Sequence, residues 1–120
     1  MIAVVFGLLA ATSLEAVRFG PYQNVVVERI GDQPMISAYG DAHVVRLHVS
    51  KAQLADCAAL VGRGGTVECA FPHSGSLDFR PLATGGYEFR FSDTLKANVV
   101  EFVVDDSGLE RALDALRTPI

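Results

Sequence analysis

The chain has 120 residues, half of them apolar, which suits one domain with a core of its own. Ten basic residues against 14 acidic ones give a net charge of −4, and the basic residues are scattered along the chain. Nucleic-acid binding is therefore disfavoured, because it depends on a clustered basic surface. Arginine outnumbers lysine eight to two, a composition that hints at a GC-rich bacterial or phage genome.

The first residues decide the expected location of the protein. Met1–Ala11 is uncharged and mostly apolar, and it predicts a buried strand over Met1–Phe6. The alternative is a signal peptide ending near Ala16, although no Lys or Arg precedes the apolar run. The run is shorter than the ~20 residues of a membrane helix. We expect a cytoplasmic protein that does not contact the membrane, with export as the alternative.

The next segment predicts a short helix followed by strands. Thr12-Ser13-Leu14-Glu15 forms a weak capping box and Gly20-Pro21 stops a helix, so a helix is expected over Ser13–Phe19. The alternative is a strand over Leu14–Phe19, because apolar and polar residues alternate there. β-branched runs then predict strands at residues 25–30, 35–39 and 42–49.

Two serines mark the starts of the main helices. Ser50 precedes Gln53 by three residues and Ser107 precedes Glu110 by three, and each follows an apolar run. This spacing predicts a capping box at both places. The first helix is expected to end at Gly62, acting as a left-handed C-terminal residue. Apolar residues at helical spacing predict the buried faces: Leu54, Cys57, Ala58 and Val61 in the first helix, and Leu109, Ala112, Leu113 and Leu116 in the second.

Alternation predicts further strands at residues 67–71, 77–79 and 87–91, whereas residues 99–104 are almost continuously apolar and predict a central strand. The expected fold is α+β over residues 1–120 as a single domain: a two-layer sandwich of a mostly antiparallel sheet with two or three helices packed on one face. With the helix at 13–19, the first elements follow a ferredoxin-like βαββαβ order.

The two cysteines are predicted to be buried free thiols in a reducing compartment. Cys57 shares a helical face with Leu54 and Val61, and Cys69 alternates with Val67 and Phe71 along a strand. The alternative is a disulfide between them if the protein is exported.

No motif predicts catalysis, a metal or a cofactor. His43 and His48 are an odd number of residues apart on one predicted strand, so their side chains leave opposite faces. The glycines of residues 62–65 follow a helix, whereas phosphate-binding loops precede one. Ser, His and Asp occur together only locally, within residues 73–78. An enzyme is therefore not favoured.

Two groups of residues remain as candidate sites. Asp105 and Asp106 end the predicted central strand, where ligands often bind in α/β proteins, and His73 is the other candidate for a ligand-binding cleft. Acids at that position also stabilise the start of a helix. The second group is predicted to bind a partner from the exposed side of the sheet: Tyr39, Arg46, His48, Glu88 and Arg90.

The leading hypothesis is a non-enzymatic protein-binding module, a small inhibitor or immunity-type protein whose acidic balance complements a basic partner. One alternative is a small-molecule-binding protein or small enzyme with an oligomeric cleft near Asp105, Asp106 and His73. The other is a structural subunit of a larger assembly, such as a homodimer formed through an edge strand.

Overall fold

Strands that follow one another along the chain pair antiparallel, in two groups of four. A computed structural model of the protein describes residues 14–18, 24–30 and 33–117, and the predicted strand or leader at the N-terminus lies outside them. The first sheet has the order β1-β2-β3-β4 and the second β5-β6-β7-β8. The strands are β1 Leu14–Arg18, β2 Asn24–Ile30, β3 Gln33–Tyr39, β4 Val44–His48, β5 Val67–Phe71, β6 Gly75–Pro81, β7 Tyr87–Asp93 and β8 Val99–Val104, and the helices are α2 Lys51–Gly62 and α3 Asp106–Arg117.

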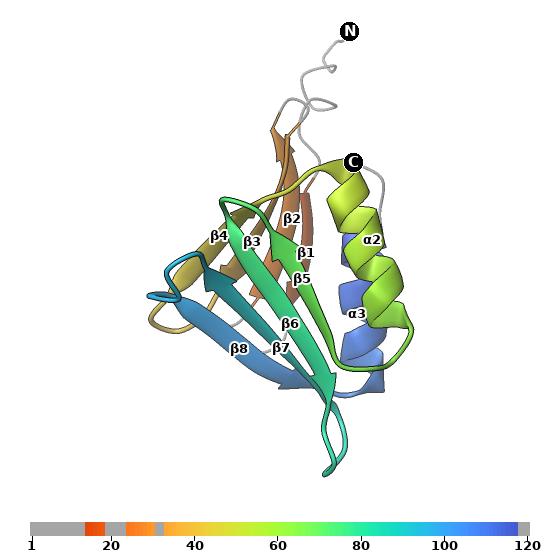
Figure 1. The fold of residues 1–120 in the computed structure, drawn as a ribbon. Helices are drawn as coiled ribbons and strands as arrows, with labels where there is room; N and C mark the ends of the chain where they lie inside the picture. The colour runs from red at the N-terminus through yellow and green to blue at the C-terminus, as the bar shows by residue number, and fades with distance from the viewer. Residues whose placement is uncertain (1–13, 19–23, 31–32, 118–120) are drawn as a thin grey trace, which may run out of the picture.

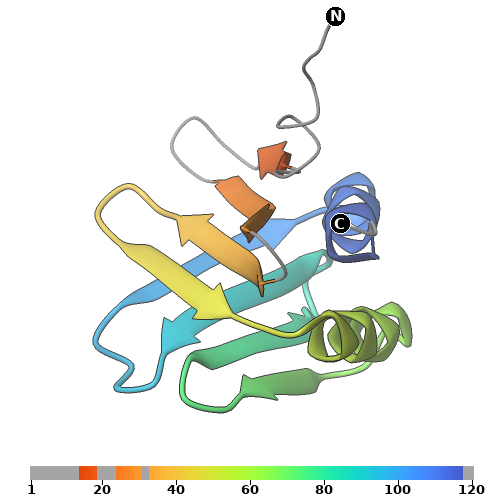
Figure 2. The same ribbon diagram turned by 90° about the horizontal axis from the view of Figure 1, so that it is seen from above.

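The α+β class is confirmed, but the expected single sheet is two sheets. Figures 1 and 2 show the sheets facing each other with their strands crossing, and α2 and α3 side by side along one side of the molecule. Helix α2 contacts β5, whereas α3 contacts β1, β2 and β8. The helices therefore close the space between two sheets instead of covering one face of a single sheet.

The helix expected over Ser13–Phe19 is wrong for the described part of that range, because Leu14–Arg18 is strand β1. Ala16 pairs with Val26 and Val17 pairs with Val25. Pairing along β2 satisfies the backbone of these residues, and the weak capping box does not compete with it. The ferredoxin-like order needs a helix before β2, and this stretch is a strand instead.

The inner faces of the sheets form one core of contrasting composition. The first sheet contributes mainly aliphatic side chains and the second five phenylalanines, all buried: Val25, Val27, Ile36, Ala38, Val45 and Leu47 from the first, and Phe71, Phe79, Phe89, Phe91 and Phe102 from the second. These residues occur at every second position, which confirms the alternation expected for sheets covered on one side.

The expectation that residues 99–104 form a central strand is wrong. Strand β8 is at the edge of the second sheet, next to β7 alone. Its apolar run conceals an alternation in which Val100, Phe102 and Val104 are buried while Val103 is 57% exposed. A valine on the outer face therefore made an edge strand resemble a buried one.

Helix α2 begins as predicted, but it ends differently. Gln53 donates its backbone N–H to Ser50 Oγ at 3.1 Å, and Ser50 donates its own to Gln53 Oε1 at 2.8 Å, which confirms the capping box. The helix runs through Gly62, and the capping residue Arg63 is right-handed. The residue with a left-handed backbone is Gly64, with φ of +87°. The chain therefore leaves the helix two residues later than predicted.

Helix α3 is capped by Asp105 and not by Ser107. Asp105 Oδ1 accepts the backbone N–H of Gly108 at 2.8 Å, and the Asp105 carbonyl accepts that of Leu109. Gly108 packs so close to β8 that an added Cβ would lie 2.6 Å from the Val104 Cβ. The predicted buried face is confirmed, with Leu109 only partly buried.

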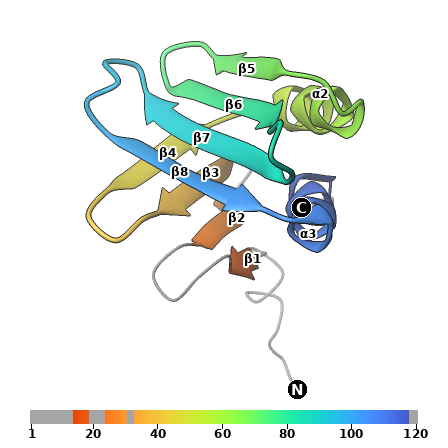
Figure 3. The same ribbon diagram turned by 90° about the horizontal axis from the view of Figure 1, so that it is seen from below.

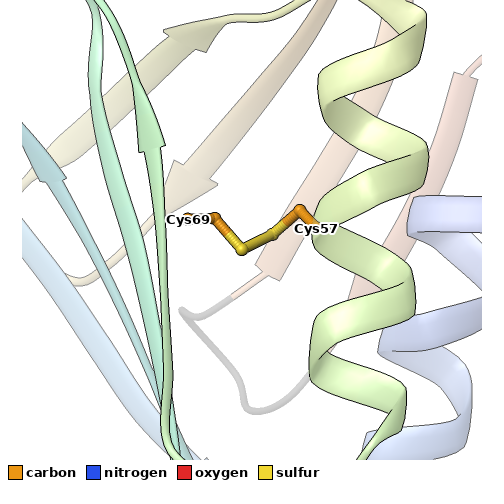
Figure 4. Close-up of a disulfide and its surroundings, with 2 residues drawn as sticks. All are labelled: Cys57 and Cys69. Carbon is orange, nitrogen blue, oxygen red and sulfur yellow. A yellow bond between two sulfur atoms is a disulfide. The ribbon is translucent and has the colours of Figure 1, made fainter.

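The prediction of free thiols is wrong, because Cys57 and Cys69 form a disulfide (Figure 4). Both residues are buried, and they join the inward face of α2 to the inward face of β5. Their Cα atoms are 5.6 Å apart, within the usual range for a disulfide. The two inward-facing positions were predicted correctly, but the sequence did not show that the two elements adjoin.

Candidate functional site

The residues predicted to bind a partner lie on two different surfaces. Tyr39, Arg46 and His48 belong to β3 and β4 of the first sheet, whereas Glu88 and Arg90 belong to β7 of the second. The guanidinium carbon of Arg46 lies 6.0 Å from the centroid of the Tyr39 ring, close enough for a cation–π contact. Because the sheets face each other through their inner sides, their outer faces cannot contact a partner as one surface.

The outer face of the second sheet carries charges that pair with one another. Arg80 Nε lies 2.8 Å from Glu88 Oε1, and Arg90 Nε lies 2.9 Å from Glu101 Oε2. The hydrogen bond that Arg90 donates to Glu101 raises the pKa of Arg90. An open groove of about 400 Å³ lies on this face, and its lining is mostly charged: Thr66, Val67, Glu68, Asp78, Phe79, Arg80, Glu88 and Arg90.

The residues predicted to bind a ligand do not meet within one chain. Asp105 caps α3, and a hydrogen bond to Asp106 raises the pKa of Tyr87. His73 lies in the turn between β5 and β6, at the end of the second sheet where Gly75 pairs with Asp93. Tyr87 pairs with Val104 at the opposite end. The aspartates are thus engaged at the start of α3, and the histidine lies at the other end of the sheet.

Strand β4 instead brings together three connecting segments that the sequence did not associate. We call these segments, residues 40–43, 72–74 and 94–98, together with β4, the loop end. His48 donates its backbone N–H to Ser74 Oγ at 2.7 Å, and His43 Nδ1 lies 3.4 Å from Asn98 Oδ1. Figures 2 and 3 show the three segments on the side of the molecule away from the helices.

The loop end contains all three histidines of the chain, His43, His48 and His73, and all three are exposed. His43 interacts with Asn98 through its ring, whereas His48 interacts with Ser74 through its backbone. Over residues 14–18, 24–30 and 33–117, no group of three or more His, Cys, Asp or Glu side chains is arranged to hold a metal ion.

The segment between β7 and β8 is held in shape by Asp93. Its Oδ1 accepts the backbone N–H of Ala97 at 2.9 Å, and its Oδ2 accepts the side-chain N–H of Asn98 at 3.0 Å. Its carbonyl accepts the N–H of Lys96, whose φ of 55° is left-handed. The hydrogen bond from Asn98, followed by those from the backbone, lowers the pKa of Asp93. The segment is a closed turn and not a loose connection.

Leu95 lies in this turn and is 85% exposed. The sequence analysis missed it, since a single leucine in a loop belongs to no periodic pattern. The available signal was its position between Asp93 and Asn98, two residues that commonly hydrogen-bond to nearby backbone.

Among the described residues, neither helix has the length and apolar character of a membrane span.

Comparisons with protein-family models, with curated proteins and with solved structures give no match to this chain. The function proposed below therefore rests on the geometry of the chain itself.

Proposed function

We propose that the chain is a non-enzymatic protein-binding module of the inhibitor or immunity type, and that it contacts its partner with the loop end. The observation that supports this is the convergence of three connecting segments around β4. Each is attached to a sheet, and hydrogen bonds that the side chains of Ser74, Asp93 and Asn98 accept fix their positions. Loops positioned by a rigid scaffold are where binding residues are concentrated in proteins.

The chemistry of the loop end also suits a protein partner. Arg46 is exposed and lies over Tyr39, and these two residue types are enriched among those that dominate binding energy. Within the loop end Arg46 and Lys96 are basic and Asp41 is acidic, so this surface carries no excess of acidic residues although the chain is acidic. This proposal retains Tyr39, Arg46 and His48 as contact residues, adds His73, and leaves out Glu88 and Arg90.

We also propose that the protein works in an oxidising compartment, because disulfides rarely persist in the cytosol. This favours export over the cytoplasm, but not cleavage near Ala16, because Leu14–Arg18 is strand β1. Cys57 and Cys69 are the only cysteines of the chain. When cells are treated with a maleimide before lysis, we expect the protein to carry no maleimide label. Reduction of the disulfide before the treatment should allow labelling. Labelling of both thiols in the unreduced protein would contradict this location.

A matched pair of charge reversals tests the binding surface. Arg46→Glu changes an exposed arginine at the loop end, and Arg80→Glu changes an exposed arginine on the outer face of the second sheet. Wild type and both variants are used as baits in an extract of the native host under non-reducing conditions. We expect a stoichiometric partner that wild type and Arg80→Glu recover and that Arg46→Glu loses.

Two results would contradict the proposal. One is that the wild-type bait recovers no stoichiometric protein. The other is that Arg46→Glu recovers the partner as well as Arg80→Glu does, which would locate the contact away from the loop end.

A further inference from the structure

Leu95 is the most exposed large apolar side chain of the described residues. It is 85% exposed, compared with 57% for Val103 and 38% for Val44. Isolated exposed apolar residues are common on protein surfaces. Leu95 differs from an ordinary exposed leucine because its backbone is fixed in a turn.

Hydrogen bonds within the turn restrict the backbone on both sides of Leu95. Two carboxylate oxygens and the carbonyl of Asp93 accept bonds from Lys96, Ala97 and Asn98, at 2.9 to 3.0 Å. The backbone N–H of Asp93 also donates to the Asn98 carbonyl at 3.3 Å. The backbone of the turn is therefore held in place while the Leu95 side chain is exposed, and little further backbone ordering is needed for it to bind. Such pre-organisation lowers the entropic cost of association.

We propose that Leu95 is the central anchor of the binding surface and that it enters a concave apolar pocket on the partner protein. This inference rests on the proposed function. A side chain that is 85% exposed is removed from water most completely by a concave surface, and its removal is favourable where the lining of that surface is apolar. The residues next to it in the turn, Thr94, Lys96 and Asn98, are polar or charged and exposed, which suits the polar rim of an interface.

Two hollows of the described residues could be considered for the leucine of a second copy, and neither suits it. The groove of about 400 Å³ on the second sheet is lined largely by Glu68, Asp78, Arg80, Glu88 and Arg90. Burying a leucine there would separate charged groups from water. The apolar space between Phe89, Phe102 and Leu116 measures about 10 Å³, far less than a leucine side chain needs.

The test compares Leu95 with an exposed apolar residue elsewhere. Leu95→Ala, Leu95→Asp and the control Val103→Asp are purified, their folding is checked by circular dichroism and melting temperature, and their affinity for the recovered partner is measured by surface plasmon resonance. We expect Leu95→Ala to weaken binding by about 30-fold or more, as for other central anchors. Leu95→Asp should abolish binding, while Val103→Asp stays within about twofold of wild type.

A photo-crosslinking residue in place of Leu95 identifies the surface that it contacts. Mass spectrometry of the crosslinked product should locate the attachment among apolar residues that line a concavity of the partner. Attachment to a flat or charged surface would overturn the proposal.

The remaining outcomes separate this inference from the proposed function. If Leu95→Asp binds the partner as tightly as wild type while Arg46→Glu does not, the anchor is wrong and the binding function stands. If wild type recovers no partner, both are overturned. Light scattering of the purified chain should give the 12.8 kDa mass of a monomer. A larger mass that Leu95→Asp returns to this value would show that a second copy occupies the leucine, and would overturn the assignment to another protein.

Discussion

The two sheets bury similar alternating faces, but they expose different ones. The inner face of the second sheet is built from phenylalanines, and its outer face pairs Arg80 with Glu88 and Arg90 with Glu101. The first sheet buries aliphatic residues, and Arg46 on its outer face contacts an aromatic ring instead of a carboxylate. Charges on the outer face of the second sheet are thus paired with one another, whereas Arg46 on β4 is not paired with a carboxylate in the same way, which fits its proposed role in contacting a partner.

The largest expected effect tests the contrast between the two inner faces. Phe89 and Val27 are buried on interior strands of the two sheets. Phe89 also contacts Phe79, Phe91 and Phe102, with ring centroids 5.0 to 6.4 Å apart. Phe89→Ala should lower the free energy of unfolding by about 4 kcal/mol and Val27→Ala by about 2 kcal/mol, measured by urea denaturation. Equal losses would mean that the aromatic cluster contributes no more than the aliphatic face.

The disulfide gives the next largest effect, since it ties α2 to the second sheet alone. Cys57 and Cys69 are separated by 12 positions. Closing a loop of this length stabilises a protein by about 3 kcal/mol through the unfolded state. The double variant Cys57→Ala, Cys69→Ala should lose about that much, and hydrogen exchange should rise in α2 more than in β2 and β3. A loss below about 1 kcal/mol would contradict this role.

A smaller effect distinguishes the two helix starts. Asp105→Ala removes a cap from α3 and should cost about 1 kcal/mol of stability, as should Ser50→Ala for α2. Ser107→Ala should change stability by less than about 0.5 kcal/mol, although the sequence favoured Ser107 as the cap. A larger loss for Ser107→Ala than for Asp105→Ala would reverse this assignment.

The smallest effect is local and depends on pH. Hydrogen bonds from Asn98 and from the backbone lower the pKa of Asp93 below its usual value of 3.8. The ionised carboxylate therefore stabilises the turn fully above about pH 4, and this stabilisation is lost as pH falls through the lowered pKa. The amide resonance of Ala97 should shift in that acidic range, whereas in Asp93→Asn it should not titrate there. An Ala97 resonance that stays constant through the range would show that the carboxylate does not hold the turn.

Local patterns in the sequence predicted most strands and both main helices correctly. Period-two alternation located β5 to β7, and the Ser50 capping box located the start of α2. These features depend on neighbours within one element. The prediction that Ser107 caps α3 was wrong, because Asp105 lies two residues earlier and its carboxylate accepts the hydrogen bond of the cap.

The errors concern contacts between distant parts of the chain. Strand β1 is fixed by pairing with β2, and the disulfide depends on α2 lying against β5. The division into two sheets likewise depends on which strands remain unpaired, and a list of strands does not contain that information. Alternation in β8 was hidden because Val103 is apolar although it is exposed.

The candidate site was predicted only in part. Tyr39 and Arg46 were recognised by residue type, and they do contact each other. Glu88 and Arg90 share that chemistry but lie on the other sheet, where Arg80 and Glu101 pair with them. The loop end could not be predicted, since it arises where β4 crosses the second sheet and meets two turns of that sheet.

The rigidity of the turn that carries Leu95 is the most direct test of the account, because it requires no partner. Backbone NMR relaxation gives an order parameter for each amide of residues 94–98. We expect values near 0.85, similar to those of β7 and β8. Values below about 0.6 for Leu95 and Lys96 would show a flexible loop, and would contradict the claim that the fold presents a pre-formed anchor.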